Sequence, residues 1–281
     1  MRKIFCCILL IIGTYAVTAQ TVYTRSDSVR VVSLLREAPK KQTTGQRMIF
    51  FARKLLGLPY VGKTLEKNKE ERLVVNLRQL DCTTFVESVL ALTRTASLGR
   101  TDFRTYCDQL RRVRYKDGKV AYVNRLHYFA YWISCHEQDG IVRSIQSPNP
   151  PFKAVAQKKI NFMSTHQSLY PMLVSHPQWL PAIKQMEQAT SGLRMRYIPK
   201  AAVTNTKLLR STVHDGDIIA TVSTKSGLDT NHVGIAVWHD DGLHMINASL
   251  IYKKVVEDKR TLSRYLAAQR SVSGIFVARP L

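Results

Sequence analysis

The sequence predicts an α+β fold in which a helix packs on an antiparallel sheet. Apolar residues recur at helical spacing through the first half of the chain, for example at Met48, Phe51 and Leu55. After Asp215-Gly216 the pattern changes to a period of two with many β-branched residues. A helical half followed by a strand-rich half with short turns is typical of α+β domains.

The N-terminus is typical of a secretory signal peptide. The basic residues Arg2 and Lys3 precede an apolar run from Ile4 to Ile12, and Val17-Thr18-Ala19 offers a small-residue cleavage site. The apolar run is too short to cross a bilayer, and no later segment has the required length and apolarity. We therefore expect residues 1–19 to be removed and residues 20–281 to form one periplasmic domain without an integral membrane segment.

The chain carries a formal charge of +22, and loss of Arg2 and Lys3 with the signal peptide leaves +20. Such an excess suggests an anionic partner. Nucleic acid is not expected, because the basic residues are spread along the chain and form no reading motif. Carboxylate-rich wall peptides or an anionic membrane surface fit the charge better, and solubility alone is the alternative reason for it.

Three cysteines remain after processing, namely Cys82, Cys107 and Cys135. An odd number outside the cytoplasm leaves at least one free thiol. Cys107 and Cys135 could form a disulfide, but their apolar surroundings favour two buried thiols. No C-x-x-C, H-E-x-x-H or other metal-ligand spacing occurs, so the sequence predicts neither a metal nor another cofactor.

The helical half contains one punctuated turn and one long polar segment. Gly57-Leu58-Pro59-Tyr60-Val61-Gly62 breaks the helical pattern, and such a turn commonly shapes the wall of a site. Tyr60 is therefore a candidate substrate contact, with simple core packing as the alternative. Residues 100–205 are expected as a mostly helical insertion, in which a helix over 122–133 carries three polar side chains away from its apolar face: Arg125, His127 and Tyr128.

The stretch from Leu80 to Leu90 carries the first candidate for chemistry. Phe85 and Val89 share a helical face, and Asp81 is suited to cap the free N–H groups of a first turn. Cys82 is then the first helical residue, where the helix dipole and unpaired amides favour the reactive thiolate. Cys82 is a candidate nucleophile, and a buried structural cysteine is the alternative.

Several short strands are expected after Asp215-Gly216, and the second of them follows a histidine. Small residues share the face of His232, which would let the Cys82 helix pack closely and bring the thiol within reach of the imidazole. His232 is thus a candidate base, with a hydrogen-bonded core histidine as the alternative. The expected strands are Asp217 to Val222, Val233 to Trp238, Leu243 to Ala248, Tyr252 to Val256 and Gly274 to Ala278.

A hairpin is expected to place an amide beside this histidine. If His239-Asp240-Asp241-Gly242 forms the loop, Trp238 pairs with Leu243, and Asn247 lies diagonal to His232 on the same face. If only Asp241 and Gly242 form the loop, Asn247 stays on the same face of the sheet but lies further from His232. A thiol, an imidazole and an orienting amide match the Cys-His-Asn logic, in which the amide fixes the tautomer of the base.

Six segments carry a resemblance to a known family. The NlpC/p60 superfamily of papain-like cell-wall peptidases and amidases is similar at Gly57-Leu58-Pro59-Tyr60, Leu80 to Glu87 and Asn231 to Ile235. Its N-acetylmuramoyl-L-alanine amidase-like branch is similar at Arg114 to Gly118, Arg125 to Tyr128 and Gly227 to Asp229. The resemblance runs from about Phe50 to the C-terminus, and it implies a papain-like fold with a nucleophile helix on an antiparallel sheet.

The resemblance implies a cysteine-dependent peptidoglycan amidohydrolase acting on muropeptides, and we expect a monomer. Carried over to this chain, it makes Cys82 the nucleophile and His232 the base. Relatives often have His-Ala-Ser where this chain has Asn247-Ala248-Ser249. Asn247 can still orient an imidazole, and His244 is the fallback orienter, although hairpin parity puts it on the opposite face.

The bond to be cleaved is left open by the residues. The branch implies the amide between N-acetylmuramic acid and L-Ala, whereas the wider superfamily implies the γ-D-glutamyl to diaminopimelate bond. A non-catalytic wall-binding protein is a further alternative, because the third polar position is altered. Candidates for substrate binding are Tyr60, Asp81, Thr83, Arg125, His127, Tyr128, Asp229 and Asn231.

Overall fold

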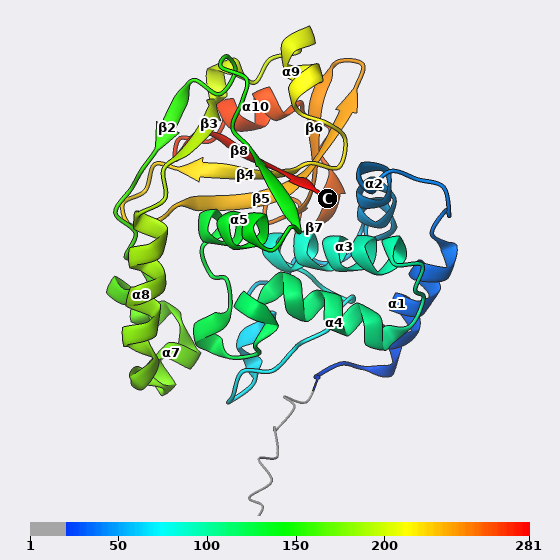
Figure 1. Cartoon of the computed structure of the whole chain (residues 1–281), viewed down its shortest axis with the longest axis vertical. Coiled ribbons are helices and arrows are strands. Elements are labelled where there is room, and N and C mark those ends of the chain that lie inside the picture. The colour runs from blue at the N-terminus through cyan, green and yellow to red at the C-terminus, as the bar shows by residue number, and fades with distance from the viewer. Residues whose placement is uncertain (1–20) are drawn as a thin grey trace, which may run out of the picture.

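One antiparallel sheet and a group of helices build the molecule, as expected for an α+β protein (Figure 1). The computed structural model describes residues 21–281. The expected signal peptide, residues 1–19, therefore lies outside the described residues. Among the described helices, none combines the length and apolar composition that a bilayer span requires.

The helices gather mainly in the first two thirds of the chain, and three of the early ones begin with a capping box. Thr24, Thr43 and Asp81 each accept a hydrogen bond from a backbone N–H of the first turn. The α-helices are Arg25–Glu37 (α1), Thr44–Lys54 (α2), Cys82–Ser97 (α3), Phe103–Arg114 (α4), Phe129–Gln138 (α5), Phe162–Thr165 (α6), Pro171–Ser175 (α7), Leu180–Ser191 (α8), Lys207–Thr212 (α9) and Leu262–Ala267 (α10).

The strands form an antiparallel sheet in the order β2-β3-β8-β4-β5-β6-β7, with β1 paired to β8. The five strands expected from the sequence after Asp215 are found as β4 to β8. Three further strands, β1, β2 and β3, come from earlier in the chain. The strands are Val142–Ile145 (β1), Ala154–Ala156 (β2), Met195–Pro199 (β3), Ile218–Ser223 (β4), Thr230–His239 (β5), Gly242–Ser249 (β6), Lys254–Glu257 (β7) and Val272–Pro280 (β8).

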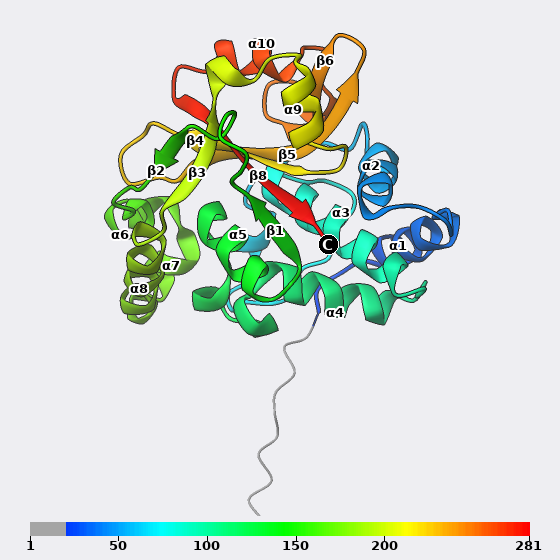
Figure 2. The ribbon, with the colours of Figure 1, turned by 45° about the horizontal axis from the view of Figure 1, so that its top comes forward.

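Helices cover both faces of the sheet (Figure 2). Phe85 and Val89 of α3 are buried in the larger core, which they share with Val233 of β5. The opposite face is covered by α9 and α10, where Met245 of β6 packs with Leu262. Because both faces of the sheet are covered, every residue of β4 is buried, in contrast to the alternation typical of a half-exposed strand.

The segment 100–205 differs from the helical insertion expected. It contributes β1 and β3, which pair with β8, and β2, which pairs with β3. The helix expected over 122–133 is also wrong in its first half, because Tyr122–Asn124 forms a single 3-10 turn and α5 begins only at Phe129. Helical spacing of apolar residues in this segment arose from two separate elements that contribute to two different cores.

A buried ion pair joins α3 to α4. Arg114 Nε donates to Glu87 Oε2 at 2.7 Å, and Arg114 Nη1 donates to the Val74 carbonyl at 2.7 Å. The two side chains are only 2% and 3% exposed. Removing one partner would leave a charge buried without compensation.

Arg114→Met should therefore lower the free energy of unfolding by about 3–5 kcal/mol, measured by urea denaturation. The matched control is Arg53→Met, which breaks the ion pair of Arg53 with Glu257, where Arg53 is 50% exposed. That change should cost less than about 1 kcal/mol. Equal losses for the two variants would contradict the assigned role of burial.

Candidate active site

Cys82 is the first residue of α3, as predicted. Asp81 is its N-cap and accepts from the Thr84 backbone N–H at 2.8 Å, while the Thr84 hydroxyl accepts from the Asp81 N–H at 2.9 Å. The carboxylate of Asp81 is thus engaged in capping, and Thr83 sits half-buried next to the thiol. Because Cys82 is the first residue of the helix, its backbone N–H has no acceptor within the helix.

The Cys82 thiol lies against the start of the β5 face rather than in open solvent. Burial raises its pKa to about 12, and the nearby Asp81 charge adds to this rise. Hydrogen bonds with the Val233 backbone N–H and with Thr83 oppose it only in part. The thiolate expected from the helix dipole alone is therefore not the resting form, and the thiol needs a base to lose its proton.

His232 of β5 and Asn247 of β6 are hydrogen-bonded. His232 Nε2 lies 3.0 Å from Asn247 Oδ1, and Asn247 Nδ2 donates to the Met245 carbonyl at 3.4 Å. Because the amide nitrogen is committed to a carbonyl, the amide oxygen faces the ring, so Nε2 carries the proton and Nδ1 keeps a lone pair. Burial lowers the pKa of His232, which keeps the ring neutral and able to accept a proton.

The hairpin register predicted from the sequence is confirmed. Trp238 pairs with Leu243, and Ile235 with Ile246, which brings Asn247 onto the face of His232. The turn itself is tighter than the expected four-residue loop, because His239 also pairs with Gly242.

The face on which His232 lies is covered differently from expectation. The face with small residues was expected to receive the Cys82 helix, but α3 packs on the opposite face with Val233. The small Ala236 instead faces the core under α10. Cys82, at the start of α3, packs against the core that contains Val233, and Val233 directly follows His232 on β5.

Tyr265 of α10 is a site residue that the sequence reasoning missed. Its ring centroid lies 6.1 Å from that of His232, and burial, with a smaller contribution from Cys82, raises its pKa to about 12. Burial and the same thiol raise the pKa of Tyr60 to about 12, so this predicted contact does lie near Cys82. Tyr265 belongs to α10, which lies between β7 and β8. The sequence of this helix offered no local signal, because only the packing of α10 brings Tyr265 close to His232.

Arg125, expected to bind substrate, is closed off by two carboxylates. Glu66 and Glu71 both accept from its guanidinium, and its side chain is only 9% exposed. Tyr115 also donates to Glu71. The charge of Arg125 is therefore neutralised inside the protein, which does not favour a direct contact with substrate carboxylates, and its role in substrate binding stays a prediction.

His127 and Tyr128 are likewise engaged by the protein. His127 Nε2 bonds the Tyr122 carbonyl at 3.0 Å, and burial lowers the pKa of this histidine to about 3. The Tyr128 hydroxyl donates to Glu187 at 2.8 Å and accepts from the Met163 N–H at 2.9 Å. Both side chains hold the helical part of the segment 100–205 together rather than facing Cys82.

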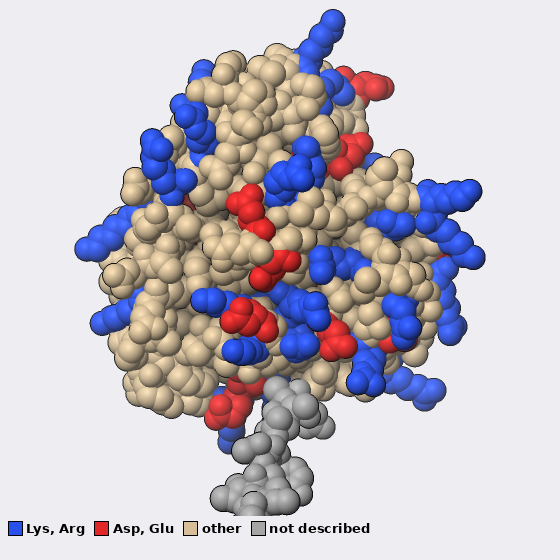
Figure 3. All heavy atoms as spheres, in the orientation of Figure 1, with Lys and Arg blue, Asp and Glu red and all other residues tan. Residues whose placement is uncertain are grey.

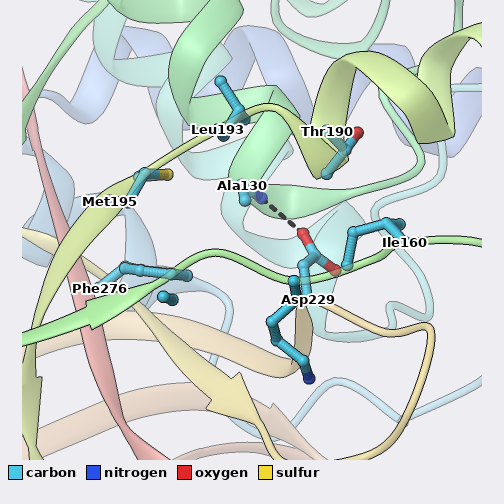
Figure 4. Close-up of a pocket in the computed structure, with 9 residues that line it drawn as sticks. Ala130, Ile160, Thr190, Leu193, Met195, Asp229 and Phe276 are labelled. Atoms are coloured by element: carbon cyan, nitrogen blue, oxygen red, sulfur yellow. Dashed lines mark hydrogen bonds between the residues drawn. The ribbon is translucent and has the colours of Figure 1, made fainter.

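Asp229 caps α5 and closes a small cavity (Figure 4). Its carboxylate accepts from the backbone N–H groups of Ala130 at 2.7 Å and Thr230 at 2.7 Å, and burial raises its pKa to about 6. The cavity holds about 20 Å³, enough for roughly one water molecule and far too small for a muropeptide. Asn231 is also used internally, since it accepts from Thr221 and donates to Ser271.

Three side chains at the far end of the same hairpin lie close enough to share a metal ion. His239, Asp241 and His244 each offer a ligand atom, and these atoms lie within 4.8 Å of one another. Each already has a protein partner: His244 Nε2 faces Asp241 at 2.8 Å, and His239 Nε2 faces Glu257 at 2.8 Å. His244 Nδ1 donates to the Asp258 backbone carbonyl at 2.8 Å, so this histidine does not orient His232. The expected independence of metal stays a prediction.

Cys107 and Cys135 are free thiols, and so is Cys82. The two buried-thiol positions preferred from the sequence thus carry no disulfide. Lys and Arg side chains are scattered over the face seen in Figure 3 and alternate with Asp and Glu. On this face the charge forms no single basic stripe that would suit nucleic acid.

The comparisons with known proteins first define a class. A crystal structure of an N-acetylmuramoyl-L-alanine amidase from Bacteroides uniformis has a TM-score of 0.78 at 37% identity, covering 84% of this chain and 98% of that one. A protein from Bacteroides fragilis, named as a candidate xylanase, gives 0.74 at 33% identity over 81% of this chain and 98% of its own. A Legionella pneumophila protein at 20% identity gives 0.71, covering 91% of this chain and 95% of its own, and shows likeness of fold alone.

The fold is thus that of amidase-like hydrolases. The sequence profile of the AmiA-like family, described as N-acetylmuramoyl-L-alanine amidase-like, matches residues 50–275, and the chain belongs to this family. None of the curated proteins matches the chain.

Asn247→Ala should lower kcat by about tenfold to several hundredfold, because an orienter assists a base that remains present. The hydrogen bond to Asn247 raises the pKa of His232, so its loss should also move the acidic limb of the kcat/KM profile to lower pH. Asn247→His should retain substantial activity. An unchanged rate and pH profile for Asn247→Ala would show that another group holds the imidazole.

Proposed function

We propose that this protein hydrolyses the amide bond between N-acetylmuramic acid and L-alanine in muropeptides, with Cys82 as nucleophile. One observation carries the proposal: His232, near the start of β5, is hydrogen-bonded to Asn247, and the next residue, Val233, belongs to the core against which Cys82 of α3 packs. Membership of the amidase-like family and the 37% identical amidase support the substrate class. The catalytic plan is that of papain-like NlpC/p60 enzymes, and we place the protein in the periplasm after signal-peptide removal.

Proton transfer comes before the attack in this mechanism. Burial keeps the Cys82 thiol protonated and His232 neutral, so Nδ1 of His232 takes the thiol proton before sulfur adds to the amide carbonyl. The ion pair of thiolate and imidazolium forms only when the substrate is present. Asn247 Oδ1 accepts a hydrogen bond from Nε2–H of His232, so the proton stays on Nε2 and Nδ1 remains free to act as the base.

The oxyanion that develops can be held by the Cys82 backbone N–H, which stands at the positive end of α3. His232 then returns its proton to the leaving amine of L-alanine, and the muramoyl group remains on sulfur as a thioester. Water adds to that thioester with His232 as base, the carbon–sulfur bond breaks, and the thiol regains its proton. No further co-reactant is required.

Mass spectrometry of defined muropeptide digests tests the proposal. The purified mature protein should release a free stem peptide that begins with L-alanine and leave an unsubstituted muramic acid. Release of a peptide beginning with diaminopimelate would instead show the γ-D-glutamyl endopeptidase activity. Binding without any cleavage would overturn the enzymatic proposal and identify a wall-binding protein.

Cys82→Ala should abolish hydrolysis and leave the fold intact, because a half-buried thiol at a helix start leaves little cavity. Cys107→Ala is the matched control, since this thiol is also half-buried and belongs to α4. Turnover is measured by product release, and folding by thermal unfolding. Turnover of Cys82→Ala at a tenth of the wild-type rate would reject the nucleophile.

Activity should survive EDTA and disappear with a thiol alkylator, because the proposed chemistry uses sulfur and imidazole alone. A metal bound by His239, Asp241 and His244 would lie far from the proposed site. His239 is seven residues from His232 along β5, which corresponds to about 23 Å. Initial rates with each reagent give the answer. Loss of activity in EDTA with resistance to alkylation would move the chemistry to a metal.

A further inference from the structure

An arginine lies beside the catalytic pair, between two tyrosine rings. The Arg260 guanidinium carbon is 5.7 Å from the ring centroid of Tyr252 and 5.4 Å from that of Tyr265. The Tyr265 ring is in turn 6.1 Å from the His232 ring. A fixed positive charge therefore stands one aromatic ring away from the proposed base.

Asp258 holds this guanidinium in one orientation. Arg260 Nε donates to Asp258 Oδ1 at 3.1 Å, and Nη2 donates to Oδ2 at 2.7 Å. Asp258 is 3% exposed and also accepts from the Arg260 backbone N–H at 2.9 Å, so its position is fixed in turn. The pairing uses one edge of the guanidinium fork. The edge formed by Nη1 and the second Nη2 hydrogen has no acceptor among the described residues, and the side chain is 32% exposed.

The surrounding loops join this arginine to the thiol. Tyr252 is 42% exposed in the turn between β6 and β7, and the Tyr60 N–H donates to the Lys253 carbonyl of that turn at 2.9 Å. Tyr60 also forms a parallel bridge with Leu80, two residues before Cys82, and the Val61 N–H donates to the Leu80 carbonyl at 3.0 Å. The two loops and the start of α10 therefore make one continuous wall along the proposed catalytic centre.

We propose that Arg260, held by Asp258 between Tyr252 and Tyr265, binds a free carboxylate of the peptide part of the substrate. A planar fork with one edge fixed and one edge open matches a carboxylate in two parallel hydrogen bonds. The aromatic rings restrict the guanidinium and exclude water from its faces, which strengthens those bonds. This role rests on the proposed function, and it replaces Arg125 as the carboxylate contact.

Two substrates that differ only in charge test the proposal. One is N-acetylmuramoyl-L-alanyl-D-glutamate, and the other is the same compound with both glutamate carboxylates converted to carboxamides. For the wild type, the amide form should have a KM about tenfold to a hundredfold higher, the range for a charge-assisted hydrogen bond. Arg260→Gln should raise the KM of the acid form by the same factor, change kcat by less than about twofold and abolish the preference between the two compounds.

Two further variants separate recognition from folding. Arg260→Lys keeps the charge but loses the fork, so it should restore part of the preference for the acid form. Arg264→Gln is the matched control, because Arg264 is exposed on α10 and forms no salt bridge within residues 21–281. It should leave both KM values unchanged. If Arg260→Gln weakens both substrates equally, Arg260 is only structural and the proposal is overturned.

Binding to protein without the nucleophile keeps this test independent of hydrolysis. Calorimetry with Cys82→Ala and with Cys82→Ala/Arg260→Gln measures the affinity of the same two compounds. A preference for the acid form that disappears with Arg260→Gln supports the carboxylate site even when the wild type proves inert, which would reject only the hydrolysis. Equal affinity of both compounds for Cys82→Ala would overturn the site while leaving the hydrolytic proposal intact.

Discussion

The pairing register of β5 with β6 is the constraint on which the proposed site depends. A Cβ atom on Gly234 would come within 2.6 Å of Met245 and 2.9 Å of the Ile246 carbonyl, so the two strands approach this closely only with glycine there. The same register places Asn247 Oδ1 3.0 Å from His232 Nε2. A shift of one residue would turn Asn247 into the opposite core and leave the imidazole without its partner.

Burial then sets the proton chemistry around this pair. Desolvation raises the pKa of the Cys82 thiol and lowers that of His232, so both groups rest in their neutral forms. Neutral partners cost less to bury than an ion pair, which suits a centre packed between α3, β5 and α10. In the proposed mechanism, charge is therefore created only during the reaction, where the Cys82 N–H and the helix dipole can stabilise it.

The arginines show how little net charge says about binding. Arg114 and Arg125 are buried, and glutamates neutralise their charges inside the protein. Arg260 differs because its partner Asp258 occupies one edge of the guanidinium only. Sequence inspection cannot separate these cases, since each arginine stands in a similarly polar stretch and its carboxylate partner is chosen by tertiary packing.

Local patterns in the sequence determined the elements that form the proposed site. The Asp81 cap, the start of α3 at Cys82 and the β5–β6 register follow from interactions between near neighbours, and each agrees with prediction. Tertiary structure alone decided which face of β5 receives α3, that β1 and β3 join the sheet, and that Tyr265 and Arg260 stand beside His232. Those outcomes depend on contacts between residues distant in the chain, for which helical or strand periodicity holds no information.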